Sequence, residues 1–136
     1  MLIESDADIR ALLAATRRIA IVGISANAAR PSHGVARYLL AAGYDVVPVN
    51  PGLREWQGLP CYPNLRAIPG PVGLVDVFRR SEEVPALVDD ASAIGAPAMW
   101  LQLDIHHDDA VARAIAAGMS VVVDRCTKIE HARLLG

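Results

Sequence analysis

Five short apolar runs alternate along this chain with segments of helical periodicity. A strand that is covered on both faces in a parallel sheet has this continuous apolar character, whereas a half-exposed strand alternates apolar and polar residues. Strands that alternate with helices form right-handed β-α-β units, so the pattern predicts an α/β fold with helices on both faces of a parallel sheet. The expected strands are Ile19–Ile24, Tyr44–Val49, Val72–Phe78, Ala98–Leu103 and Met119–Val123.

Capping residues predict where the intervening helices begin and end. Ser and Asp residues precede the first helix, and Ser81 is expected to cap the helix after the third strand. Gly43 is expected to end the second helix in a left-handed conformation. The Pro- and Gly-rich stretch from Asn50 to Pro71 predicts an irregular crossover with one helical turn at Leu65–Ile68. The expected helices lie within residues 6–18, 35–40, 81–95, 108–117 and 129–135.

The length of 136 residues fits one domain, so we expect residues 1–136 to form a single Rossmann-like unit with three layers. The predicted order of the five strands is 3-2-1-4-5. In sheets of this kind a ligand crevice opens beyond the carboxyl ends of the strands, where the strand order reverses. The predicted reversal lies between the first and fourth strands, and the residues that follow each strand are therefore candidate ligand contacts.

The charge balance limits the classes of partner. A formal net charge of −2 provides no excess of cations for nucleic acid or an acidic membrane surface, so neither is expected as a partner. No apolar run approaches the roughly 18 residues of a membrane span, and the acidic N-terminus lacks the pattern of a secretory signal. Cys61 and Cys126 suit two free thiols in a reducing compartment, which predicts a cytoplasmic location. The sequence leaves a homo-oligomeric state open.

The loop after the first strand is one candidate for a phosphate site. Small residues there allow close approach of an anion to backbone N–H groups at a helix start, and Gly23, Ser25, Asn27 and Arg30 are the candidate contacts. The dinucleotide fingerprint G-x-G-x-x-G is incomplete, because Ser25 and Ala28 stand where its second and third glycines would be. Alone, this loop is equally compatible with a polar turn that holds no ligand.

The next two strand ends add candidate contacts. Asn50 and Pro51 follow the second strand, where a NAD-binding protein usually carries an acidic residue for the ribose hydroxyls. Phe78, Arg79 and Arg80 follow the third strand, and a guanidinium group matches phosphate oxygens while an aromatic ring can lie against a base or ribose.

Each of these candidates also has a structural interpretation. The arginines could form ion pairs with Asp76 or Glu83, and Phe78 could belong to the core. Cys126 with His131 could form a nucleophile and base, although a Cys beside a strand end is more often a small buried residue. Charged residues of the last segment could instead pair among themselves and fix the final helix.

Several segments together resemble a known family. The chain is similar to the stand-alone CoA-binding-domain proteins, whose fold resembles the N-terminal domain of the succinyl-CoA synthetase α-subunit. The resemblance covers nearly the whole chain and rests on Val22–Ser25, Arg30–Leu39, Gly43–Pro51, Val75–Arg80, Trp100–Gln102, Asp124–Cys126 and Lys128–His131.

The resemblance implies that coenzyme A or an acyl-CoA is bound through its adenosine and phosphates by the loops after the first three strands. The positions that carry this implication are Gly23, Ser25, Asn27, Arg30, Asn50, Pro51, Phe78, Arg79 and Arg80. The synthetase's phosphohistidine and succinate site have no counterpart here, so binding without catalysis is expected. The alternatives are a small NAD(P)-binding oxidoreductase, a CoA-linked thiol enzyme using Cys126, and a domain that only docks an acidic protein partner.

Overall fold

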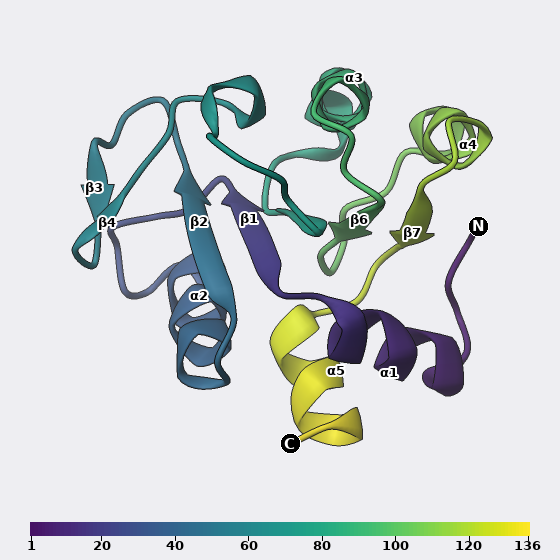
Figure 1. Cartoon of the computed structure of the whole chain (residues 1–136), viewed down its shortest axis with the longest axis horizontal. Helices are drawn as coiled ribbons and strands as arrows, with labels where there is room; N and C mark the ends of the chain where they lie inside the picture. The colour runs from purple at the N-terminus through teal and green to yellow at the C-terminus, as the bar shows by residue number, and fades with distance from the viewer.

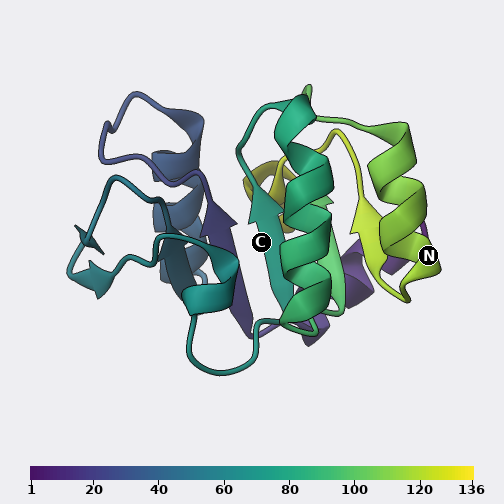
Figure 2. The ribbon, with the colours of Figure 1, turned by 90° about the horizontal axis from the view of Figure 1, so that it is seen from above.

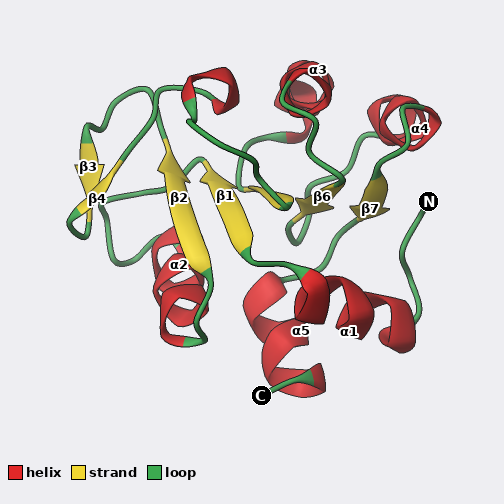
Figure 3. Cartoon of the chain, in the orientation of Figure 1, coloured by secondary structure: helices red, strands yellow, loops and turns green.

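Five parallel strands form a central sheet between helices in the computed structural model, which describes residues 1–136 (Figure 1, Figure 3). Every pair of neighbouring strands is parallel, as expected for strands joined by crossovers on the faces of the sheet. The predicted α/β class and Rossmann-like architecture are confirmed. The strands are β1 (Arg18–Val22), β2 (Asp45–Val49), β5 (Leu74–Val77), β6 (Ala98–Leu101) and β7 (Ser120–Val122).

Helices cover both faces of the sheet, and Figure 2 shows two of them, α3 and α4, in front of the strands. Each face has its own apolar core, because the strands bury side chains on both sides. None of the helices combines the length and apolar character that a membrane crossing requires. One face carries α1 (Asp6–Ala15), α2 (Pro31–Ala41) and α5 (Thr127–Leu134), and the other carries the short η1 (Leu65–Ala67), α3 (Val84–Ala93) and α4 (Asp108–Ala116).

The order of the strands differs in part from the prediction. The sheet has the order β2-β1-β5-β6-β7. Strand β5, the third of the five predicted strands, therefore lies between β1 and β6, whereas the prediction placed it outside β2. The predicted neighbours β1 and β2, and β6 and β7, are confirmed. The connection from residue 50 to 73 is long enough to reach either side of β1, and apolar periodicity does not encode which side it takes. The reversal in strand order therefore lies between β1 and β5.

The connection after β2 contains a hairpin that the sequence analysis missed. Strands β3 (Glu55–Trp56) and β4 (Leu59–Pro60) pair antiparallel around Gln57 and Gly58, which have φ values of 51° and 78°. Two consecutive residues with positive φ form the tight turn that suits a two-residue hairpin. The strands are too short to give a period-two signal, although Trp56 is buried. The predicted helical turn in this region is confirmed as η1.

The capping predictions are confirmed at two helices and wrong at a third. Ser5 caps α1 by accepting a hydrogen bond from the Asp8 N–H, and Gly43 ends α2 with φ of 99°. Ser81 does not cap α3, because a short turn, η2 (Ser81–Glu83), precedes that helix. The Ser81 hydroxyl instead accepts from the backbone N–H of His106, which ties this turn to the loop after β6.

Candidate functional site

A cleft of about 680 Å³ opens at the carboxyl ends of β1, β5 and β6, at the point where the strand order reverses. This volume lies within the usual range of small-molecule sites, roughly 300–1,000 Å³. The first turn of α2 and the loop after β6 line the cleft, as does Cys126, which directly precedes α5. The cleft thus lies at the end of the sheet that was predicted from sequence.

The loop after β1 is held in one shape by hydrogen bonds from the surrounding elements. The carbonyl oxygen of Ser25 accepts from the Trp56 indole N–H at 2.9 Å and from Nδ1 of buried His33 at 2.9 Å. The hydroxyl of Ser25 accepts from the backbone N–H of Asn27, whose own side chain accepts from Ala29. The polar side chains of Ser25 and Asn27 therefore stabilise the shape of the loop. A ligand would contact mainly the backbone of this loop.

Close packing of two strand ends explains why glycine follows β1. Gly23 has φ of 88°, and a Cβ at this position would lie 2.7 Å from the carbonyl oxygen of Phe78. The neighbouring loop is attached by Asn50, which donates to the carbonyl of Ile24 at 2.7 Å and accepts from the N–H of Gly52. The first three strand ends are therefore one rigid unit around the cleft.

The three candidate arginines have different surroundings. Arg30 precedes α2 and Arg79 follows β5, and both line the cleft without forming an ion pair. Arg80 points to solvent and pairs with Glu82 and Glu83 at 3.4 and 3.6 Å. The structural interpretation that pairs an arginine with Glu83 thus holds for Arg80. Two unpaired guanidinium groups remain available to an anion in the cleft.

Most of the candidate binding residues come together, and three do not. Pro51 lies in a separate depression of about 380 Å³ between η1 and α3, which shares only Arg79 with the main cleft. Asn27 and Arg80 line neither of these cavities. The candidates that line the main cleft are Gly23, Ser25, Arg30, Asn50, Phe78 and Arg79.

Three polar residues that line the cleft were not among the sequence candidates, namely Ser32, Gln102 and Asp104. Ser32, in the first turn of α2, is 4% exposed, and its hydroxyl has no hydrogen-bond partner yet is not sealed from solvent. Its position in the first turn of a helix that starts at the cleft was the signal that could have found it. Gln102, the residue after β6, is also 4% exposed and lines the cleft. From sequence, Gln102 was expected at the end of the fourth strand beside the crevice, but it was given no role.

A buried polar triad lies directly behind Gln102. Asp76 of β5 is fully buried, and its carboxylate accepts from the Gln102 amide at 2.5 Å and from the Thr127 hydroxyl at 2.9 Å. Burial raises the pKa of Asp76 to about 7, and the two hydrogen bonds oppose that shift. This residue therefore has its own partners, and the predicted pairing of Asp76 with an arginine is wrong.

Cys126 and His131 are held in different surroundings. Cys126 lines the cleft, whereas Nδ1 of His131 shares a hydrogen bond of 2.9 Å with the Tyr38 hydroxyl. The His131 ring also lies edge-on to Tyr38 and Tyr44, with centroids 5.5 and 5.6 Å apart. The histidine therefore serves the packing of α5 against α2, and nothing in this arrangement supports a thiol enzyme. No group of three His, Cys, Asp or Glu side chains is arranged to hold a metal ion.

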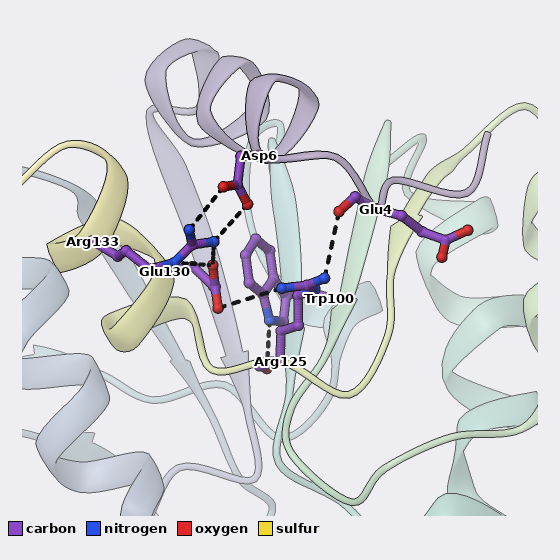
Figure 4. A network of polar contacts seen from close by, with 6 residues as sticks. All are labelled: Glu4, Asp6, Trp100, Arg125, Glu130 and Arg133. Carbon is purple, nitrogen blue, oxygen red and sulfur yellow. Dashed lines mark hydrogen bonds and ion pairs between the residues drawn. The ribbon is translucent and has the colours of Figure 1, made fainter.

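A network of charged residues fixes α5 beside the cleft (Figure 4). Glu130 is 7% exposed and lies between Arg125 and Arg133, and Arg133 also forms a double hydrogen bond with Asp6 of α1. The hydrogen bond from Arg133 lowers the pKa of Asp6. The predicted pairing that fixes the last helix is confirmed for Arg125, Glu130 and Arg133, whereas Asp124 accepts from the backbone N–H of Asp104 instead.

Comparison with known proteins decides the family. The sequence matches the family model described as CoA binding domain over residues 17–132. The chain belongs to this CoA binding domain family. It is 37% identical over 128 residues to the uncharacterized protein YneT of Bacillus subtilis, with 94% of this chain and 95% of YneT covered.

Solved structures show the same domain both alone and within a longer enzyme. A hypothetical protein from Pyrococcus horikoshii OT3 has a TM-score of 0.95 and 39% identity, with 98% of this chain and 94% of that chain covered. The dinucleotide forming acetyl-coenzyme A synthetase 1 of Ca. Korarchaeum cryptofilum has a TM-score of 0.70 and 28% identity, with 76% of this chain but 25% of the synthetase covered. The CoA binding domain described here is thus similar to one part of a synthetase chain and to nearly all of a small protein.

Proposed function

We propose that this protein binds coenzyme A or an acyl-CoA in the cleft at the carboxyl ends of β1, β5 and β6, and carries or senses it without chemistry of its own. The observation that carries the proposal is the pair of unpaired guanidinium groups of Arg30 and Arg79 in this cleft, in a chain of the CoA binding domain family. Together with the open hydroxyl of Ser32 they form a cradle for phosphate at the start of α2.

The shape of the cleft supports a nucleotide at its β1 and β2 side. Asn50, Gly23 and Phe78 form a tight backbone surface there, and the Phe78 side chain borders the cavity. We assign the phosphates to Arg30, Ser32 and Arg79, with Ser25 and Asn27 shaping the loop that holds them. Pro51 and Arg80 lie outside this cleft, so we assign them no contact with the phosphates.

The surroundings also favour CoA over a nicotinamide dinucleotide. Asn50 stands where an acidic ribose ligand would be needed, and its side-chain oxygen is already engaged by Gly52. We place this activity in the cytoplasm, where the free thiols Cys61 and Cys126 would remain reduced.

Native mass spectrometry of freshly purified protein, followed by calorimetric titration with CoA and with NAD at matched salt, tests this function. We expect a retained ligand of CoA or acyl-CoA mass, and a lower dissociation constant for CoA than for NAD. Equal or tighter binding of NAD, or no binding of CoA, would contradict the proposal.

A further inference from the structure

Gln102 has its amide nitrogen fully engaged on the side away from the cleft. Nε2 donates to Asp76 Oδ1 at 2.5 Å and to Thr127 Oγ1 at 2.9 Å, and Thr127 Oγ1 donates in turn to Asp76 Oδ2 at 2.9 Å. A primary amide has two N–H groups, so both donors of Gln102 are used. All three side chains are nine-tenths or more buried, which makes this triad a fixed part of the interior.

The oxygen of the same amide is free. Oε1 of Gln102 accepts no hydrogen bond from the protein, and it is not sealed from solvent, because no buried polar atom of a side chain lacks a partner. Gln102 lines the cleft, so the exposed part of this nearly buried residue faces the cavity. Where Asp76 is ionised, rotation of the amide would place Oε1 against a carboxylate that only accepts hydrogen bonds. The floor of the cleft therefore presents one oriented acceptor.

The position of this acceptor indicates what kind of donor it would meet. Gln102 follows β6, one strand further from β1 than Arg79, and its neighbours in the cleft are the apolar Leu103 and Ile105 and the acidic Asp104. A neutral N–H on a chain with apolar segments suits these surroundings, whereas a phosphate has no donor to offer and would be repelled by a carbonyl oxygen.

We propose that Gln102 Oε1 accepts a hydrogen bond from an amide N–H of the pantetheine arm of CoA, with Asp76 and Thr127 as positioning residues that fix the direction of the amide. This inference rests on the proposed function and names the part of the ligand read at this end of the cleft. It makes Gln102 a specificity residue, because a ligand without an N–H at this point would leave a desolvated acceptor without a partner.

The test compares CoA with adenosine 3′,5′-bisphosphate, which has the nucleotide half of CoA and lacks the arm. In the parent protein both should bind, with CoA the tighter ligand. In Gln102→Met, which keeps the length of the side chain and removes the acceptor, CoA affinity should fall about tenfold while the nucleotide changes by less than about twofold. Melting temperature and circular dichroism of each variant report whether the fold is retained.

A second pair of variants tests the positioning role without touching the cleft. Thr127→Val removes the acceptor for Nε2 at nearly constant volume and should weaken CoA by about threefold to tenfold, again sparing the nucleotide, and Thr127→Ser should restore the parent affinity. A measurement on the ligand side uses two CoA analogues, each with an ester in place of one of the two amides of the pantetheine arm. One analogue should bind the parent more weakly than CoA does, whereas Gln102→Met should bind that analogue and CoA equally.

The possible outcomes separate the inference from the function on which it rests. If the parent binds neither CoA nor the bisphosphate, the proposed function is overturned. Normal binding by the parent, with Gln102→Met and Thr127→Val either unchanged or equally weakened toward both ligands, would overturn the role of Gln102 alone.

Discussion

Gly23 lies so close to Phe78 that a methyl group on its Cα would stand 2.7 Å from the Phe78 carbonyl oxygen. The contact joins the ends of β1 and β5 at the point where the strand order reverses, and it brings Arg79 against the same turn, with its Cδ 3.4 Å from that methyl position. This end of the cleft, with the Arg79 side chain beside it, therefore requires glycine at position 23 for two reasons. A larger residue would clash with Phe78, and the φ of 88° is unfavourable for other residues.

Gly23→Ala should destabilise the fold and weaken ligand binding together. The variant combines an unfavourable φ with a clash against backbone that cannot move easily, and we expect a loss of about 2–4 kcal/mol in the free energy of unfolding. Gly43→Ala is the matched control, because its φ is 99° but nothing lies within 4 Å of the added methyl. Chemical denaturation should show a loss of only about 1 kcal/mol for the control. Equal losses in the two variants would refute the close-packing explanation.

Asp76 should make stability depend on pH in a defined direction. Its pKa in the folded protein is about 7, above the ordinary value of about 3.9, so the folded state binds more protons between these two pH values. The free energy of unfolding should therefore fall as pH rises from about 4 to about 7, by up to about 4 kcal/mol from this group alone, and then level off.

Asp76→Asn is the control that isolates this contribution. Asparagine can keep one acceptor for Gln102 and offer a donor to Thr127, yet it does not titrate. Relative to the parent, the variant should gain stability as the pH rises from about 4 to about 8, as measured by urea unfolding at several pH values. Parallel pH profiles for parent and variant would show that the buried carboxyl does not titrate in this range.

Ser32 should contribute to binding and little to folding. Its hydroxyl faces the cleft without a partner, so Ser32→Ala removes a donor for phosphate and breaks no hydrogen bond within the protein. We expect about a threefold to tenfold loss of CoA affinity with a nearly unchanged melting temperature. Ser120→Ala, at the amino end of β7 and far from the cleft, should leave affinity unchanged. A large fall in the melting temperature of Ser32→Ala would reveal a structural role instead.

The sequence identified the strands, the fold class and the cleft end of the sheet, because apolar runs, caps and strand-to-helix loops are local signals. It did not determine the place of β5, since that depends on how the long connection after β2 crosses the sheet. It also did not distinguish Arg79 from Arg80. Adjacent residues of an extended segment point in opposite directions, and only the turn after β5 selects Arg79 for the cleft and leaves Arg80 to Glu82 and Glu83.

The sequence could not show that the hydroxyl of Ser32 and the amide oxygen of Gln102 lack a protein partner, for a related reason. Whether a hydroxyl or an amide has a partner depends on contacts between segments that are far apart in the chain, such as Gln102 with Asp76 and Thr127. Buried polar residues are usually satisfied by other protein groups, so their spacing alone gives no sign of a ligand.

The most direct test of the account is the affinity for CoA of Arg79→Ala beside Arg80→Ala, measured by calorimetry at low and moderate salt. The two arginines are adjacent in sequence, but only Arg79 lies in the cleft, while Arg80 is exposed and already paired. We predict that Arg79→Ala loses about 2–5 kcal/mol of binding free energy and that Arg80→Ala loses less than about 1 kcal/mol. An Arg79→Ala variant that is folded and binds CoA as tightly as the parent would contradict the account.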